Sequence, residues 1–201
     1  MKIICIEGNY KPTKTKSNNL AEPVFFLKPE TSVLRNKIPF FIPEHSGKII
    51  PKVNLVLKIC KLGKNIQEKF AHSYYDEIGI GVDMEASDLL IKCKENGLPW
   101  EPAKAYDSST PLGSFTPKIN LSNSQNINFS LLKNGELISK ANSSDLLFAF
   151  DQIIAYISKY VMLKMGDYIF TGAPELSEYV NINDKIECFI EDKLMLSFNI
   201  K

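Results

Sequence analysis

Residues 81–107 read GVDMEASDLLIKCKENGLPWEPAKAYD, an apolar run that gives way to carboxylates and then to a helical pattern. The carboxylates are Asp83, Glu85 and Asp88, and Lys104 follows shortly after the only tryptophan of the chain. Asp83 and Glu85 are two residues apart, so they share one face if the strand continues that far. Carboxylates at the end of a strand, with a lysine nearby, are typical of a metal-assisted enzyme that acts on acidic substrates.

The overall composition indicates an ordinary globular protein. The chain has 201 residues, of which 44% are hydrophobic and 23% charged, and this suits one domain with a sizeable core. The net charge of +1 gives no global attraction to nucleic acid or to membranes, so neither is an expected partner. No segment has the roughly 18 apolar residues that a membrane span needs.

The cysteines and the first residues indicate a reducing compartment. The four cysteines, Cys5, Cys60, Cys93 and Cys188, are scattered and form no CxxC pair. The apolar run in MKIICIEG is too short for the core of a signal peptide, so it predicts a first strand instead. We therefore expect reduced thiols, most of them in the core, in a cytoplasmic protein.

Short strands and one short helix are predicted for the first part of the chain. Apolar runs broken by prolines favour strands at sheet edges or ends. Residues 65–77 carry apolar side chains at helical spacing, with Asn65 as a candidate N-cap. The predicted strands are KIICIE (2–7), PVFFLKP (23–29), IPFFIP (38–43), KVNLVLKIC (52–60) and IGIGVDM (78–84).

Two further helices and a hairpin are predicted for the rest. Residues 86–97 form a helical pattern that Gly97 ends. The clearest helix covers residues 143–161, with Ser143 or Ser144 as its cap and Asp145 in its first turn. An Asn-Gly pair at residues 134 and 135 predicts a hairpin. The last predicted strands are DYIFTGAP (167–174), KIECFIED (185–192) and KLMLSFNIK (193–201).

The sum of these elements is a strand-dominated α+β fold with two or three short helices. We expect a single domain over residues 1–201. The segment from residue 11 to 19 is polar and rich in lysine, and it is predicted to be a mobile loop.

The order of the pieces resembles the fumarylacetoacetate hydrolase family. The resemblance covers nearly the whole chain, and GLPW followed by AK, together with GDYIFTGAP, is its most specific part. The motifs that carry it are CIEGNY (5–10), FLKP (26–29), VDMEASD (82–88), GLPWEPAKAYD (97–107), KNGEL (133–137), LKMGDYIFTGAP (163–174) and IECFIED (186–192).

This resemblance implies a mixed β-roll around a cleft, in a homodimer or in a dimer with an active paralogue. It also implies one Mg²⁺ or Mn²⁺ ion held by three carboxylates. The implied substrates are small oxo-acids such as acylpyruvates, oxaloacetate and hydroxydienedioates. The implied chemistry is C–C hydrolysis, decarboxylation or isomerisation, in which the ion stabilises an enolate.

The family's metal positions are only partly kept in this sequence. The resemblance places the metal aspartate on Asp83, which is present, and a Glu-x-Glu pair on Lys52 and Asn54, which are not carboxylates. Glu85 offers a replacement carboxylate beside Asp83. We name Asp83 and Glu85 as the candidate metal ligands, and we expect a salt bridge from Asp83 to Lys52 or to Lys104.

The positions that the resemblance assigns to chemistry are also largely changed. The general-base histidine falls on Thr13, and the glutamate that orients it falls on or near Lys16. An arginine and a glutamine fall on Ser87 and Leu90, and a carboxylate-binding threonine falls on Ala173. The residues that remain as candidates are Lys104 for catalysis and Tyr10, Lys104, Thr171 and Gly172 for substrate binding.

Two interpretations follow. The first is a non-catalytic or strongly diverged family member, a pseudoenzyme that binds a small oxo-acid or another anion. The second is a Mg²⁺- or Mn²⁺-dependent hydrolase, decarboxylase or isomerase with a rebuilt site that includes Asp83, Glu85, Asp88 and Lys104. A weaker alternative is a metal-free activity in which Lys52 or Lys104 stabilises an enolate.

Overall fold

The computed structural model describes most of the chain, namely residues 1–11, 20–35, 38–121, 123 and 126–201. The loop predicted after the first strand lies almost entirely outside these residues, and so do Thr13 and Lys16.

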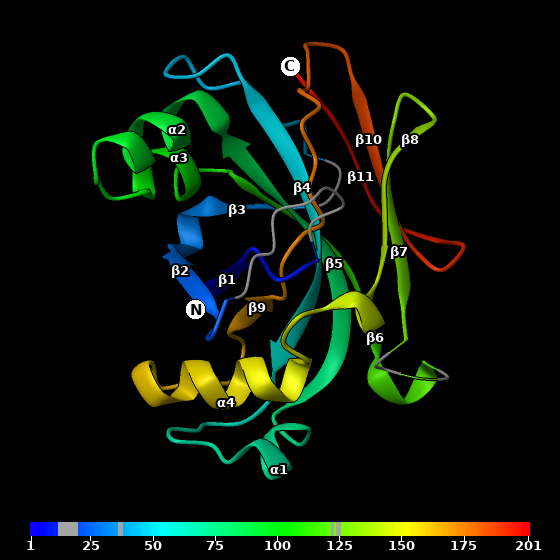
Figure 1. Cartoon of the computed structure of the whole chain (residues 1–201). Coiled ribbons are helices and arrows are strands. Elements are labelled where there is room, and N and C mark those ends of the chain that lie inside the picture. The colour runs from blue at the N-terminus through cyan, green and yellow to red at the C-terminus, as the bar shows by residue number, and fades with distance from the viewer. Residues whose placement is uncertain (12–19, 36–37, 122, 124–125) are drawn as a thin grey trace.

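Strands dominate the described residues and form two sheets (Figure 1). Seven strands make a mixed sheet in the order β2-β1-β9-β4-β5-β6-β3, and four make an antiparallel sheet in the order β11-β10-β7-β8. In the mixed sheet, β1 runs parallel to β9, and β3 runs parallel to β6. The bounds are β1 Ile3–Glu7, β2 Val24–Lys28, β3 Val33–Arg35, β4 Ile49–Ile59, β5 Tyr75–Ala86, β6 Thr110–Pro117, β7 Asn128–Lys133, β8 Glu136–Asn142, β9 Tyr168–Phe170, β10 Lys185–Ile190 and β11 Lys193–Asn199.

The main hydrophobic core is shared between the two sheets. Ile78, Ile80 and Val82 of β5 are fully buried in the same cluster as Phe129 and Leu131 of β7. In the larger sheet, β4 and β5 are the longest strands, and nearly all their side chains are buried. Their register therefore fixes which polar side chains of the sheet face one another.

The described residues contain four α-helices, two of which are single turns. The bounds are α1 Glu68–Ala71, α2 Ser87–Glu95, α3 Glu101–Lys104 and α4 Phe150–Tyr160. Figure 1 shows α1 and α4 at one end of the molecule and α2 and α3 together at the other end. Among these residues no helix combines the length and the apolar character that a membrane crossing requires.

Most of the predicted elements are confirmed. Gly97 follows α2 with a φ of 62°, as expected for a glycine that ends a helix. Asn134 and Gly135 both have positive φ between β7 and β8, which is the geometry of a two-residue hairpin turn. All four cysteines are free thiols, and Cys5, Cys93 and Cys188 are buried.

The strand predicted at residues 38–43 is wrong. This segment makes only an isolated bridge between Phe40 and Ile200, although Phe40 and Ile42 donate backbone hydrogen bonds to the end of the chain. Pro39 and Pro43 lack the amide protons that a longer ladder would need.

The helix predicted at residues 65–77 is only four residues long. Asn65 has a positive φ of 52° and is not the N-cap, because it and Ile66 bond to Ser158 at the end of α4. The strand β5 then begins at Tyr75, whose ring packs at the edge of the Phe150 ring. Tertiary contacts on both sides override the local helical pattern.

The last helix begins later than predicted. Residues 143–145 form a separate 3₁₀ turn, so neither Ser143 nor Ser144 caps α4. The Ser143 hydroxyl instead accepts a hydrogen bond from the Ile127 amide, and the Gln152 side chain accepts one from the Ala149 amide just before α4.

A fully buried asparagine connects three distant parts of the chain. The Asn9 side chain donates to the carbonyls of Phe148 and Thr171 and accepts from the Phe148 amide. Gly172 has a φ of 109°, and a Cβ atom there would lie 2.7 Å from the Asn9 Cβ atom. This close contact places the loop after β9 against the end of β1.

Candidate functional site

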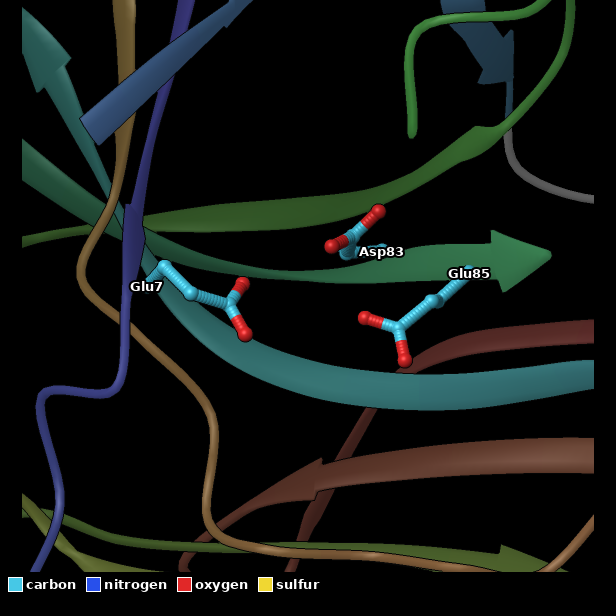
Figure 2. Close-up of side chains that lie close together, drawn as sticks. All are labelled: Glu7, Asp83 and Glu85. Carbon is cyan, nitrogen blue, oxygen red and sulfur yellow. The ribbon is translucent and has the colours of Figure 1, made fainter. Parts of the chain in front are cut away.

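Three carboxylates converge where β1 ends beside β4 and β5. Glu7 is the last residue of β1, and Asp83 and Glu85 lie on the same face of β5. Figure 2 shows the three carboxylate groups directed toward a shared space. One oxygen from each group lies within 4.8 Å of the others. The strand β5 continues to Ala86, beyond the predicted end at Met84, so the condition for a shared face of Asp83 and Glu85 is met.

Lys104 is the centre of this group. Its Nζ atom lies 2.8 Å from Asp83 Oδ2, 2.5 Å from Glu85 Oε2 and 3.1 Å from Glu7 Oε2. The side chain is fully buried at the end of α3, and its ammonium group lies 5.1 Å from the centre of the Phe26 ring. The predicted salt bridge between Asp83 and Lys104 is therefore confirmed.

A second buried lysine holds the other side of Asp83. Lys28, the last residue of β2, places Nζ 2.7 Å from Asp83 Oδ1 and donates to the Ser109 carbonyl and hydroxyl. Sequence reasoning treated Lys28 only as part of a motif and Glu7 only as the end of an apolar run. Glu7 lies within the CIEGNY motif (5–10), and that position was the available signal.

Lys52 is the third lysine of the group, and it bridges two carboxylates. Its Nζ atom lies 2.7 Å from Glu85 Oε2 and 3.6 Å from Glu7 Oε1. Lys52 and Asp83 are backbone partners in the β4–β5 register, but the ammonium group pairs with Glu85 rather than with Asp83. The buried Glu85 Oε2 accepts no directed hydrogen bond within the described residues, so it is held by charge alone.

The group is electrically balanced, with three carboxylates and three ammonium groups. Burial alone would raise the pKa of Asp83, but Lys104 and Lys28 outweigh it and hold this pKa well below its usual range. The pKa of Glu7 is likewise lowered, because Lys104 and Lys52 outweigh the effect of burial. Burial would lower the pKa of Lys104, but Asp83, Glu7 and Glu85 raise it well above its ordinary value. Asp83, Glu7 and Lys104 therefore stay charged at neutral pH.

The Asn54 side chain supports the neighbouring loop. Its Oδ1 atom accepts a hydrogen bond of 2.9 Å from the Gly172 amide, and its amide group donates to the Lys52 carbonyl. The Thr171 hydroxyl donates to the Leu55 carbonyl. The structure thus brings Thr171 and Gly172 to the edge of the site through β4, and their predicted role in substrate binding stays a prediction.

Tyr10 lies apart from the carboxylates. Its ring meets the Phe129 ring edge-on at 6.1 Å in the core, and its buried hydroxyl has no hydrogen-bond partner within the described residues. Its predicted contact with a substrate stays a prediction.

The polar side chains that follow β5 form hydrogen bonds around the start of α2 rather than with the carboxylates of the site. The Asp88 carboxylate accepts from the Ser46 hydroxyl and from the Leu89 amide at the start of α2. The Ser87 hydroxyl donates to the Lys48 carbonyl. Asp88 is therefore not brought to the carboxylates at the site.

A small pocket opens over the charged group. Its cavity volume is about 20 Å³, enough for about one water molecule, and the volume including the open mouth is about 270 Å³. Its described lining consists of Cys5, Ile6, Glu7, Gly8, Lys52, Asn54, Asp83 and Ala173. Burial raises the pKa of the Cys5 thiol to about 12, so this thiol is not a reactive nucleophile at neutral pH. A larger hollow of about 620 Å³ lies elsewhere, along α4, and none of the charged group lines it.

The charged group does not fit a divalent ion as it stands. Carboxylate oxygens are suitable ligands for Mg²⁺ or Mn²⁺. However, both Asp83 oxygens already face a lysine, and Glu85 Oε2 faces two. A divalent ion 4 Å from one ammonium group would meet a repulsion of roughly 8 kcal/mol at an effective dielectric of 20. Metal-ion catalysis is therefore not available at this site while Lys52 keeps its contacts with Glu7 and Glu85.

Comparison with known proteins agrees with the fold. The family described as fumarylacetoacetate (FAA) hydrolase C-terminal matches residues 2–199. The chain belongs to this family.

Relatives with named activities match along most of the chain. A mitochondrial oxaloacetate tautomerase of Mus musculus is 34% identical over 201 residues, which cover 99% of this chain and 91% of the relative. An oxaloacetate tautomerase of Escherichia coli is 34% identical over 177 residues, 87% of this chain and 81% of the relative. The crystal structure of a fumarylpyruvate hydrolase from Pseudomonas aeruginosa, in complex with Mn²⁺ and pyruvate, superposes with a TM-score of 0.90 at 25% identity, covering 100% of this chain and 89% of that one.

Asp83→Asn is expected to destabilise the fold by about 3–5 kcal/mol, because it leaves the buried Lys28 and Lys104 ammonium groups without their shared carboxylate. Urea unfolding of the two proteins measures the difference. Asp192→Asn, at an exposed turn, is the control and should change stability by less than about 0.5 kcal/mol. Similar losses in the two variants would show that the buried pairs do not stabilise the fold.

The protein should become less stable as the pH falls, because the same carboxylates become protonated. The pKa values of Asp83 and Glu7 are lowered from ordinary values of 3.8 and 4.5, so the unfolded chain binds more protons below about pH 5. The stabilisation is therefore present above that pH and is lost as the pH falls. Urea unfolding between about pH 3 and pH 7 should give a steeper decline for the native chain than for Asp83→Asn. Parallel curves would contradict the assignment.

Proposed function

We propose that this protein binds small carboxylate anions of the 2-oxo-acid class in the pocket over Lys52, as a strongly diverged, non-catalytic member of its family. The observation that carries the proposal is the position of the Lys52 ammonium group. It lines the pocket, and 18% of its side chain is exposed while those of Lys28 and Lys104 are buried.

The contacts of Lys52 leave it able to bind a ligand. Its contact with Glu7 is the longest ion pair of the group, at 3.6 Å, and it donates no directed hydrogen bond to Glu85. A ligand carboxylate can therefore displace Glu7 and accept charge-assisted hydrogen bonds from Nζ. The cavity of about 20 Å³ holds about one water molecule, so a bound carboxylate would lie largely in the open mouth of the pocket.

The choice of 2-oxo-acids follows the relatives. Oxaloacetate and fumarylpyruvate are named in their activities, and pyruvate is named with the Pseudomonas aeruginosa structure. The altered positions Lys52 and Asn54 argue that binding is kept while the ion-dependent chemistry is lost. An activity assigned to this chain only because of its fold and its sequence identity to the relatives would rest on analogy.

The second candidate function is that of a Mg²⁺- or Mn²⁺-dependent tautomerase, decarboxylase or hydrolase of small oxo-acids. Two observations favour it: the carboxylate oxygens of Glu7, Asp83 and Glu85 lie within 4.8 Å of one another, and the named relatives are oxaloacetate tautomerases. It requires an ion to displace Lys52.

Calorimetry with oxalate, a planar mimic of a 2-oxo-acid enolate, tests the proposal. Lys52→Met should weaken oxalate binding about tenfold or more, equivalent to about 1.4 kcal/mol, because a charge-assisted contact is lost. Lys58→Met is the control, since Lys58 lies on the same strand, is paired with Glu77 and is outside the pocket. Absence of oxalate binding by the native chain, or equal affinity in the two variants, would refute the proposal.

An assay of the enol-to-keto conversion of oxaloacetate separates the two candidates. The chain is first stripped with a chelator and then measured with and without added Mg²⁺ or Mn²⁺. The proposal expects no turnover above the uncatalysed rate under either condition. Turnover that depends on the ion would establish the second candidate.

The proposed assembly is a homodimer in the cytoplasm. Apolar side chains that are more than half exposed, such as Phe41, Leu62, Met165 and Ile182, offer surface for a partner, and the buried free thiols suit a reducing compartment. Sedimentation equilibrium should give twice the chain mass of 22.7 kDa. A monomer at all concentrations would exclude the homodimer, and a dimer with an active paralogue would then be the alternative.

A further inference from the structure

We infer that the Lys52 ammonium group is the built-in cation of this site, so that the native protein needs no divalent ion there and does not bind one. The inference deepens the proposed function, on which it rests for the role of the pocket. Its test measures metal binding and is therefore independent of whether any oxo-acid binds.

The first argument is the position of the ammonium group. Glu7 and Glu85 come from different strands, and Lys52 Nζ contacts both, at 3.6 Å and 2.7 Å. A cation that bridges carboxylates of separate strands does what a bound metal ion would do for them. Lys104 also contacts both glutamates, but its single charge is shared with Asp83, so it does not neutralise Glu7 and Glu85 by itself.

The second argument is charge. With Lys52 present, three carboxylates face three ammonium groups. Without Lys52, three carboxylates would face only Lys28 and Lys104, which leaves one negative charge uncompensated. Uncompensated charge of this kind is costly, and a divalent cation is the simplest partner that relieves it.

The third argument is space. Lys52 lines a pocket that has a cavity volume of about 20 Å³ and is open to solvent, and its ammonium group contacts Glu85 there. A shorter or uncharged side chain at this position leaves room for an ion with some of its water. Asp83 remains held by Lys28 on one oxygen and by Lys104 on the other, so the ion would bind mainly to Glu7 and Glu85.

The test is the binding of Mg²⁺ and Mn²⁺ to chelator-stripped native protein, Lys52→Met and Lys52→Glu, measured by calorimetry and by the thermal unfolding midpoint. Lys52→Met removes the charge, and Lys52→Glu adds a ligand. Lys58→Met is the matched control on the same strand. Circular dichroism identifies any variant that does not fold.

We expect no binding by the native chain or by Lys58→Met at about 1 mM ion. We expect at least one of the two Lys52 variants to bind with a Kd below about 100 µM, with a midpoint that rises with ion concentration, since a ligand that binds only the folded state stabilises it. Ion binding by the native chain would overturn the inference, and so would folded Lys52 variants that bind no ion. If both variants fail to fold, the native measurement still decides.

Oxalate binding by a native protein that binds no metal supports both the function and this inference. A native protein that binds neither keeps the inference and rejects the proposed function. A native protein that binds a divalent ion rejects the inference, whatever its affinity for oxalate.

Discussion

The arrangement of the site depends on one buried interaction, the Lys104 ammonium group surrounded by Asp83, Glu85 and Glu7. Removing an ammonium group from water costs several kcal/mol unless carboxylates face it closely. Those carboxylates come from β1 and β5, which belong to the same sheet but are not neighbours in it. The sheet register must therefore be correct before the charge can be buried. Asp83 in turn compensates Lys28 at the end of β2, so one carboxylate ties a third strand to the same group.

The side chains at the altered family positions, Lys52 and Asn54, form ion pairs and hydrogen bonds within the protein. Lys52 stands where the resemblance expects a carboxylate, and it pairs with Glu85 and Glu7. Asn54 stands where it expects a second one, and it holds the amide of Gly172. The exchange keeps the local charge balanced and the loop in place. These contacts are the basis of our proposal that a lysine, rather than a metal ion, is the cation of this site.

Family membership and chemistry are separate conclusions for this chain. Identity of 34% to an oxaloacetate tautomerase over 99% of the chain establishes common descent and the fold. Function resides in the few side chains at the site, so sequence identity alone does not carry a relative's activity to this chain. The buried Asn9 and the closely packed Gly172, whose φ of 109° suits only glycine, both hold the backbone together and would be needed whatever the cleft binds.

The sequence by itself determined the family, most strands, the hairpin and the helix ended by Gly97, and it left Lys52 and Lys104 as alternative partners of Asp83. The family and these elements are set by local patterns and by motif order. Only the tertiary structure brought in Glu7 and Lys28, because their partners lie 97 and 55 residues away. It also shortened the helix predicted at residues 65–77 and gave Lys52 its partner, Glu85 rather than Asp83. Which carboxylate a side chain in a sheet contacts depends on the strand register and on the side-chain rotamer. Neither of these can be inferred from the spacing of residues along one strand.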